Sequence, residues 1–176
     1  AWRHFSTAYR HYPMSNALGY VGPIHDGIVW PLYLEPVNRR LAPSWELGWP
    51  APGDRIGECL RFQHRRDSDF TLDEVILLLE KLCHAWDKGV AILRRLEKTC
   101  GNNEAGMREI GVARALGVLF HSGLNIFRFY RLRERLAITG ESAGLAILAD
   151  MEKLVLEEIV ASRTMLPLVM NDSSLG

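Results

Sequence analysis

From Thr71 onward, apolar residues recur at alternating steps of three and four, a spacing typical of a helix with one apolar face. Thr71 followed by Glu74 forms a capping box, which predicts the start of this helix. Gly101-Asn102-Asn103 predicts its end. Gly89 stands where the apolar series lacks a large side chain, and predicts the close approach of a neighbouring helix. The predicted seam is Leu72, Val75, Leu79, Leu82, Trp86, Leu93 and Leu96.

Two further long helices are predicted after this one. The second extends from about Glu104 to Ile138 and is apolar on most of its circumference, which indicates a central, buried helix. The third follows a turn at residues 139–142, continues to about Met165 and is closed by Pro167. Its predicted inward residues are Ile147, Met151, Leu154 and Ile159.

These patterns predict a mainly α fold, an up-down bundle of three or four helices with a long ordered Pro/Trp-rich loop near the N-terminus. The fourth helix would be a short one within the first eighteen residues, with Trp2, Phe5 and Tyr9 on one face. We expect one helical domain over residues 1–176, with the short helix and loop in 1–69 and the bundle in 70–170. The first residues, Ala-Trp-Arg, and the last, NDSSLG, favour a fragment of a larger protein.

Composition argues against some partners. The 21 Lys and Arg balance the 21 Asp and Glu, so nucleic acid and anionic membranes are not expected partners. No unbroken apolar run approaches the ~20 residues of a membrane span, and no signal peptide is visible, which favours a cytoplasmic location. Cys59, Cys83 and Cys100 match no zinc pattern. They are predicted to be free, buried thiols, with one disulfide left as the alternative.

The segment from Gly19 to Asp69 is rich in proline and aromatic residues. A connection this long inside a compact domain is unusual, and a flexible linker would lack the aromatics, so an ordered functional or interface-forming segment is predicted. Its prolines and tryptophans are Pro23, Pro31, Pro36, Pro43, Pro50 and Pro52, with Trp30, Trp45 and Trp49.

This loop has the side chains that a sugar site needs, because aromatic rings cover the faces of a pyranose while short polar groups bind its hydroxyls. The alternative is that the aromatics pin the loop onto the bundle. The predicted substrate-binding residues are His25, Asp26, Trp30, Tyr33, Glu35, Trp45 and Trp49, a set that Tyr20, Glu46 and Asp54 could extend.

Catalysis within the chain has weaker support. Asp26 and Glu35 could form the carboxyl pair of a glycosidase, but a salt bridge or a hydrogen bond to loop backbone explains either acid as well. No catalytic residue is therefore assigned. His4 and His11 could share a helix face without a third ligand, and no nucleotide-binding or hydrolase motif occurs, so neither metal nor cofactor is predicted.

The second helix carries two polar features. Arg114, His121, Asn125 and Arg128 share one face and could bind a carboxylate or a sugar hydroxyl, or form a face toward solvent or another domain. The stretch FRFYRLRERL carries four arginines, which suit either a nucleic-acid surface or the negative end of the helix dipole.

The stretch NALGYVGPIHDGIVWPLYLEPVNRRLAPSW, with LPLVMNDSSLG near the C-terminus, resembles the region that follows the catalytic barrel of large bacterial glycoside-hydrolase-like proteins. In such proteins a helical domain packs beside a (β/α)₈ barrel. The resemblance implies a carbohydrate substrate and a catalytic centre in the barrel. This chain has no βα repeat, and it has no catalytic motif that can be transferred.

The expected function is therefore that of a non-catalytic accessory domain of a carbohydrate-processing protein. Its loop would line a sugar site or dock on the catalytic domain of the same parent chain. The alternative is a helical interaction module that forms homo-oligomers and binds no small molecule.

Overall fold

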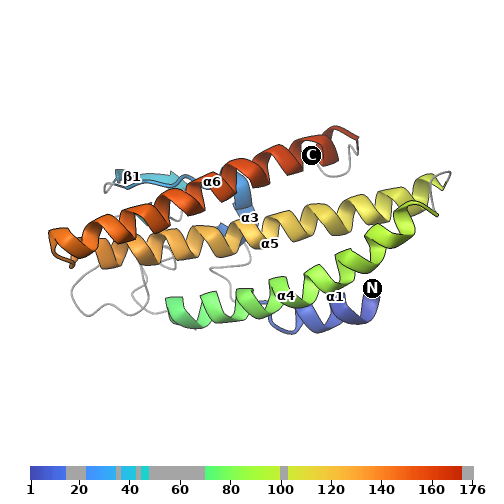
Figure 1. The fold of residues 1–176 in the computed structure, drawn as a ribbon, viewed down its shortest axis with the longest axis horizontal. Coiled ribbons are helices and arrows are strands. Elements are labelled where there is room, and N and C mark those ends of the chain that lie inside the picture. The colour runs from blue at the N-terminus through green and yellow to red at the C-terminus, as the bar shows by residue number, and fades with distance from the viewer. Residues whose placement is uncertain (15–22, 35–36, 43–44, 48–69, 100–102, 172–176) are drawn as a thin grey trace.

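The computed structural model describes residues 1–14, 23–34, 37–42, 45–47, 70–99 and 103–171 of the chain (Figure 1). The short elements come first and the three long helices follow. In order they are α1 (Trp2–Tyr9), α3 (Pro23–Asp26), the 3₁₀ helix η1 (Gly27–Val29), β1 (Val37–Ala42), β2 (Trp45–Leu47), α4 (Leu72–Glu97), α5 (Glu104–Ala137) and α6 (Glu141–Asn171).

The three long helices run alternately up and down, with α5 between α4 and α6 (Figure 1). Helix α1 packs on α4, while α3 and η1 pack on α5. The prediction of a mainly α, up-down bundle is confirmed, and α5 is the central helix as its apolar circumference indicated. Within the predicted loop, β1 and β2 form a short antiparallel pair that was not predicted from the sequence. Most of that loop lies outside the described residues.

Helices α4 and α5 both begin with a side-chain cap, of which the one at Thr71 was predicted. The Thr71 hydroxyl accepts a hydrogen bond from the Glu74 amide at 3.3 Å, and the Glu74 carboxylate accepts one from the Thr71 amide at 2.8 Å, which completes the capping box. At α5, the Asn103 side chain accepts a hydrogen bond from the Gly106 amide at 3.0 Å. These bonds satisfy amide groups that the first turn of a helix leaves without partners.

Aromatic rings join α1, α4 and α5. The Trp86 ring lies 4.3 Å from that of Phe5 and 5.0 Å from that of Phe120, measured between ring centroids. Its indole N–H also donates to the Ala113 carbonyl of α5 at 2.8 Å. Trp86 is therefore buried with its one polar atom satisfied, as a buried tryptophan requires.

Two glycines lie where neighbouring elements pack on the long helices. A Cβ at Gly89 would lie 2.2 Å from the Phe5 ring, so the predicted close approach at this position is confirmed, with α1 as the neighbour. A Cβ at Gly123 of α5 would lie 3.5 Å from the Ile24 Cα, an ordinary van der Waals distance, at the point where α3 rests on the central helix.

Three predicted details of the long helices are wrong. Pro167 lies inside α6 instead of closing it, and it is exposed, so the carbonyl that loses its partner can be hydrated. Ile159 is 42% exposed, because the buried line of α6 passes through Ile147, Met151 and Leu154 and then leaves Ile159 to one side. Leu96 is 47% exposed, since the buried residues of α4 end at Val90. On α1, Phe5 is buried, whereas the predicted companions Trp2 and Tyr9 are exposed.

Candidate functional site

The residues of the predicted sugar site have different surroundings. Trp30 is buried in the hydrophobic core at 5% exposure, and Tyr33 is half-buried against that core. His25 and Asp26 belong to the short helix α3, and Trp45 belongs to β2, but their side chains lie outside the described residues. Glu35 and Trp49 also lie outside the described residues. The burial of Trp30 agrees with the alternative in which the aromatic residues pin the loop onto the bundle.

Two side chains of α5 hold the segment that follows Trp30. The Tyr130 hydroxyl donates to the Pro31 carbonyl at 2.7 Å, and the Arg133 Nε donates to the Leu34 carbonyl at 2.9 Å. Arg133 is fully buried, with its guanidinium carbon 5.6 Å from the Tyr130 ring centre. A buried arginine needs such compensation from hydrogen bonds and an aromatic face. This part of the loop is therefore attached to the bundle through its backbone carbonyls.

The polar stripe predicted on α5 forms ion pairs within the bundle. Arg114 contacts Glu97 at 2.9 Å, His121 contacts Asp87 at 3.0 Å, and Arg128 contacts Glu80 at 2.9 Å. One turn further along, Arg131 contacts Asp73 at 3.0 Å. All four acids belong to α4. We call these four ion pairs between α4 and α5 the ladder. Its acidic partners could have been found in the sequence, because Asp73, Glu80 and Asp87 are spaced by seven.

Most arginines of the basic stretch FRFYRLRERL contact other groups within this chain. Arg128 and Arg131 belong to the ladder, and Arg133 holds the Leu34 carbonyl. Three of its four arginines therefore contact groups of this chain.

On its other side, α5 contacts a single carboxylate of α6. The Glu158 side chain accepts hydrogen bonds from the Ser122 hydroxyl at 2.5 Å and from the Asn125 amide at 3.1 Å. Ser122 is fully buried and Asn125 nearly so, so Glu158 supplies the acceptors that these buried donors require. Asn125, for which ligand binding was one of two predicted alternatives, is here part of the α5–α6 interface.

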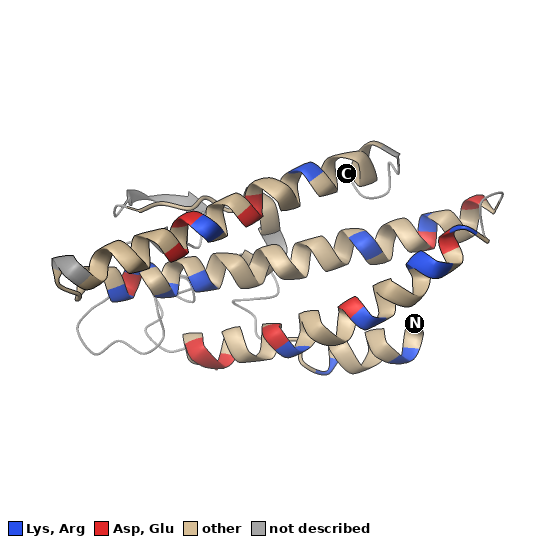
Figure 2. Ribbon diagram, in the orientation of Figure 1, with Lys and Arg blue, Asp and Glu red and all other residues tan. Residues whose placement is uncertain are grey.

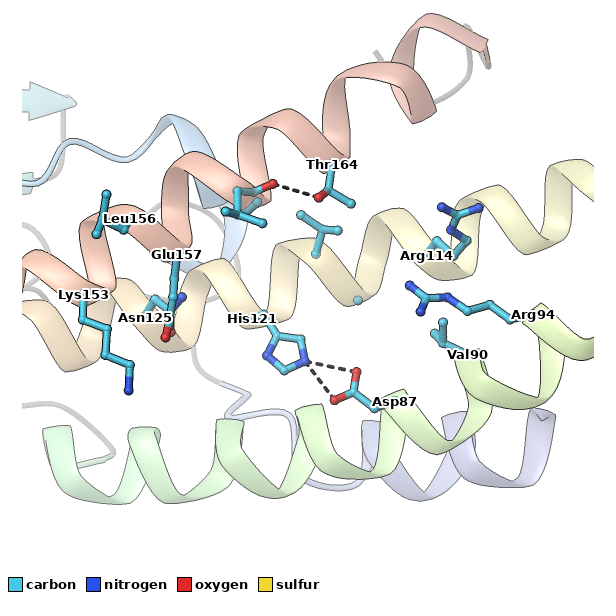
Figure 3. Close-up of a pocket in the computed structure, with 14 residues that line it drawn as sticks. Asp87, Val90, Arg94, Arg114, His121, Asn125, Lys153, Leu156, Glu157 and Thr164 are labelled. Atoms are coloured by element: carbon cyan, nitrogen blue, oxygen red, sulfur yellow. Dashed lines mark hydrogen bonds and ion pairs between the residues drawn. The ribbon is translucent and has the colours of Figure 1, made fainter.

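A groove opens between α4 and α6, with α5 as its floor (Figure 3). Its volume is about 560 Å³. The His121–Asp87 pair lies at the α4 side, with Arg94 and Arg114 toward one end and Lys153 toward the other (Figure 3). The remaining lining is mostly apolar and includes Val90, Gly117, Val118, Leu156, Val160 and Ala161.

The outer face of α6 carries exposed apolar residues. We define it as Leu145, Ala149, Glu152, Leu156, Ile159, Arg163, Leu166 and Met170, all of which are exposed. Leu156 also lies at the edge of the groove. Its large apolar members are between 42% and 76% exposed, from Ile159 to Met170. Figure 2 shows that charged residues along α6 gather mainly in its middle. Apart from Ile159, the residues predicted to be apolar and inward on this helix did not include this second set, although its spacing by four and three is visible in the sequence.

The described residues show little metal or thiol chemistry. They contain no group of three or more His, Cys, Asp or Glu that could hold a metal ion. Cys83 is a free, buried thiol, as predicted, and burial raises its pKa from 9.0 to about 12. The thiolate is therefore scarce at neutral pH. Cys59 and Cys100 lie outside the described residues.

One described helix, α5, is long and apolar enough to cross a membrane by length and composition. Of its most apolar stretch, 56% is buried inside the bundle, and the core helix of a soluble protein meets the same criteria. The apolar stretch of α5 is interrupted by polar residues, so it contains no unbroken apolar run of membrane-spanning length.

No protein-family model matches the chain, and neither a curated protein nor a solved structure matches it. The predicted link to glycoside-hydrolase-like proteins, and the carbohydrate function that it implies, stay predictions.

Proposed function

We propose that this chain is a helical interaction module that docks the outer face of α6 on an apolar helical surface of a partner. The observation that carries this proposal is the exposure of the apolar residues on the outer face, which recur from Leu145 to Met170 and are separated only by Glu152 and Arg163. Leu145 is 73% exposed, Leu166 61% and Met170 76%. Single exposed apolar residues are ordinary, but several of them on one face of a helix are typical of an interaction site.

The spacing of the outer face supports a helical partner. Its members follow steps of four and three from Leu145 to Met170, which is the repeat by which two helices pack along a shared seam. The buried line of α6, with Ile147, Met151 and Leu154, already contacts the central helix. Helix α6 therefore has two apolar sides, and only one of them is covered within the described bundle.

The polar groups of the chain favour this function over ligand chemistry. The ladder residues of α5 contact acids of α4, and Asn125 contacts Glu158. These contacts leave the stripe as a structural feature of the bundle. The second predicted function, an interaction module without a small-molecule ligand, has the better support from the described residues.

The test is size-exclusion chromatography of lysates from the organism that makes this protein. It compares the apparent mass of the tagged wild-type chain with that of a tagged variant. We expect the wild-type chain to elute above its own mass, and Leu156→Glu with Ile159→Glu to elute at its own mass. Both side chains are exposed, so the variant should unfold at the same urea concentration as the wild type.

The matched control is Lys81→Glu with Lys88→Glu on the exposed side of α4. It changes two exposed positions of another helix and should keep the larger mass. A wild-type chain that elutes at its own mass, or a control that loses the larger mass as well, would contradict the proposal.

A further inference from the structure

We infer that the partner of the outer face is a second copy of this chain, with the two α6 helices antiparallel about a two-fold axis. The inference rests on the proposed function and goes further, because it names the partner and the register. In a two-fold interface, contacts occur in reciprocal pairs. If one residue of the first copy contacts another residue of the second copy, the same contact occurs again with the two copies exchanged. A self-pairing face must therefore be complementary to itself when reversed.

The outer face meets this requirement at one register. With the axis between Glu157 and Glu158, the eight positions form reciprocal pairs, because the steps of four and three read the same in both directions. The apolar pairs are Leu145 with Met170, Ala149 with Leu166, and Leu156 with Ile159. Small Ala149 opposite large Leu166 is the kind of alternation that lets facing helices interdigitate.

The two charged members of the face determine the direction. In the antiparallel register Glu152 stands opposite Arg163 of the second copy, and the axis creates this contact twice. In a parallel pair in register, each Glu152 would instead face Glu152 and each Arg163 would face Arg163, which is repulsive. Neither side chain has an ion-pair partner among the residues that the structure describes.

The extent of the face is sufficient for stable pairing. Leu145 to Met170 spans ~38 Å of helix at the usual rise per residue. That is between three and four heptads, the length at which an apolar repeat indicates a coiled coil. The positions that flank the face on one side, Leu148, Val155, Ser162 and Val169, carry no charge that would oppose the approach of a second helix.

The test is a charge-swap series on the purified chain, measured by sedimentation equilibrium over a range of protein concentrations. We expect the wild type to dimerise. Glu152→Arg and Arg163→Glu should each weaken the dimer by roughly 10- to 100-fold, because each replaces two attractive contacts with two repulsive ones. The double variant, Glu152→Arg with Arg163→Glu, should restore the wild-type dissociation constant to within about threefold.

Matched controls make the same charge changes elsewhere on exposed positions. Glu109→Arg on α5 and Lys81→Glu on α4 should leave the dissociation constant unchanged. Circular dichroism of each variant should match that of the wild type, since all four side chains are exposed.

Two results would overturn the inference. One is a wild type that stays monomeric at high concentration, and the other is a double variant that is no better than the single variants. These results are distinct from failure of the proposed function. A monomeric purified chain whose complex in lysate still depends on Leu156 and Ile159 would keep the outer face as a docking surface and assign it to a different protein.

Discussion

At the scale of single residues, Gly89 shows how one missing side chain positions an element. Phe5 occupies the space that a Cβ at this position would need, at 2.2 Å from the Phe5 ring. The same ring packs against that of Trp86, with 4.3 Å between the ring centroids, so it has little freedom to move aside. The N-terminal helix therefore reaches the core because α4 has a glycine at this point.

We predict that Gly89→Ala lowers the free energy of unfolding by about 1–3 kcal/mol, because a well-packed site must shift to accept a methyl group. Urea denaturation measures the change. The control is Gly111→Ala in α5, where a Cβ would meet nothing within 4 Å. There alanine should stabilise the protein by up to about 1 kcal/mol through helix propensity. A Gly89→Ala variant as stable as Gly111→Ala would show that α1 does not pack against this glycine.

At the scale of elements, α5 uses different polar residues for its two long neighbours. It contacts the acids of α4 through Arg114, His121 and Arg128, which are partly solvent-exposed pairs and contribute little stability each. It contacts α6 through Ser122 and Asn125, which are buried and share the carboxylate of Glu158. The second arrangement should matter more, because buried donors without acceptors are costly.

We predict that Glu158→Gln lowers the free energy of unfolding by about 1–2 kcal/mol, since an amide replaces one of the two acceptor oxygens with a donor. Glu157→Gln is the matched control. It changes the neighbouring exposed acid of α6, and its effect should stay within about 0.5 kcal/mol. Equal losses for both variants, measured by thermal or urea denaturation, would remove the special role of the Glu158 carboxylate.

At the scale of the whole molecule, the long helices lie side by side, and this arrangement gives them unequal burial. Helix α5 has neighbours on several sides, in α4, α6, α3 and η1. Helix α6 packs mainly on α5 and exposes its outer face, and α4 is covered on a second side by α1. The least covered helix is thus the one to which we assign docking.

We predict that amide hydrogen exchange follows this order in the dilute protein. Amides of α5 between Ala113 and Tyr130 should exchange most slowly, and those of α6 after Arg163 among the fastest of the helical amides, because few buried contacts hold that end and Pro167 interrupts its hydrogen bonds. Exchange followed by mass spectrometry at low concentration measures this. Protection of the end of α6 that equals or exceeds that of α5 would contradict the order.

Much of the architecture could be predicted because it depends on local patterns. The capping box at Thr71, the breaker before Glu104 and the apolar circumference of α5 are properties of adjacent residues, and the structure has helices where they indicated. The candidate sugar site was harder to predict. Trp30 is a residue type that is common both in sugar sites and in protein cores, and the structure places it in the core. The residue type alone cannot separate these two roles.

The sequence by itself determined which long segments are helical, where two of them begin and which helix is central, because hydrogen bonds and apolar periodicity within one helix involve residues a few positions apart. The tertiary structure alone decided what each polar stripe contacts and which apolar side of α6 is covered. Ile159 and Met151 are both apolar residues of α6, yet one is exposed and the other buried. That difference arises because α5 packs against only one of the two apolar sides of α6. This packing is a contact between distant parts of the chain, and the local sequence pattern does not determine it.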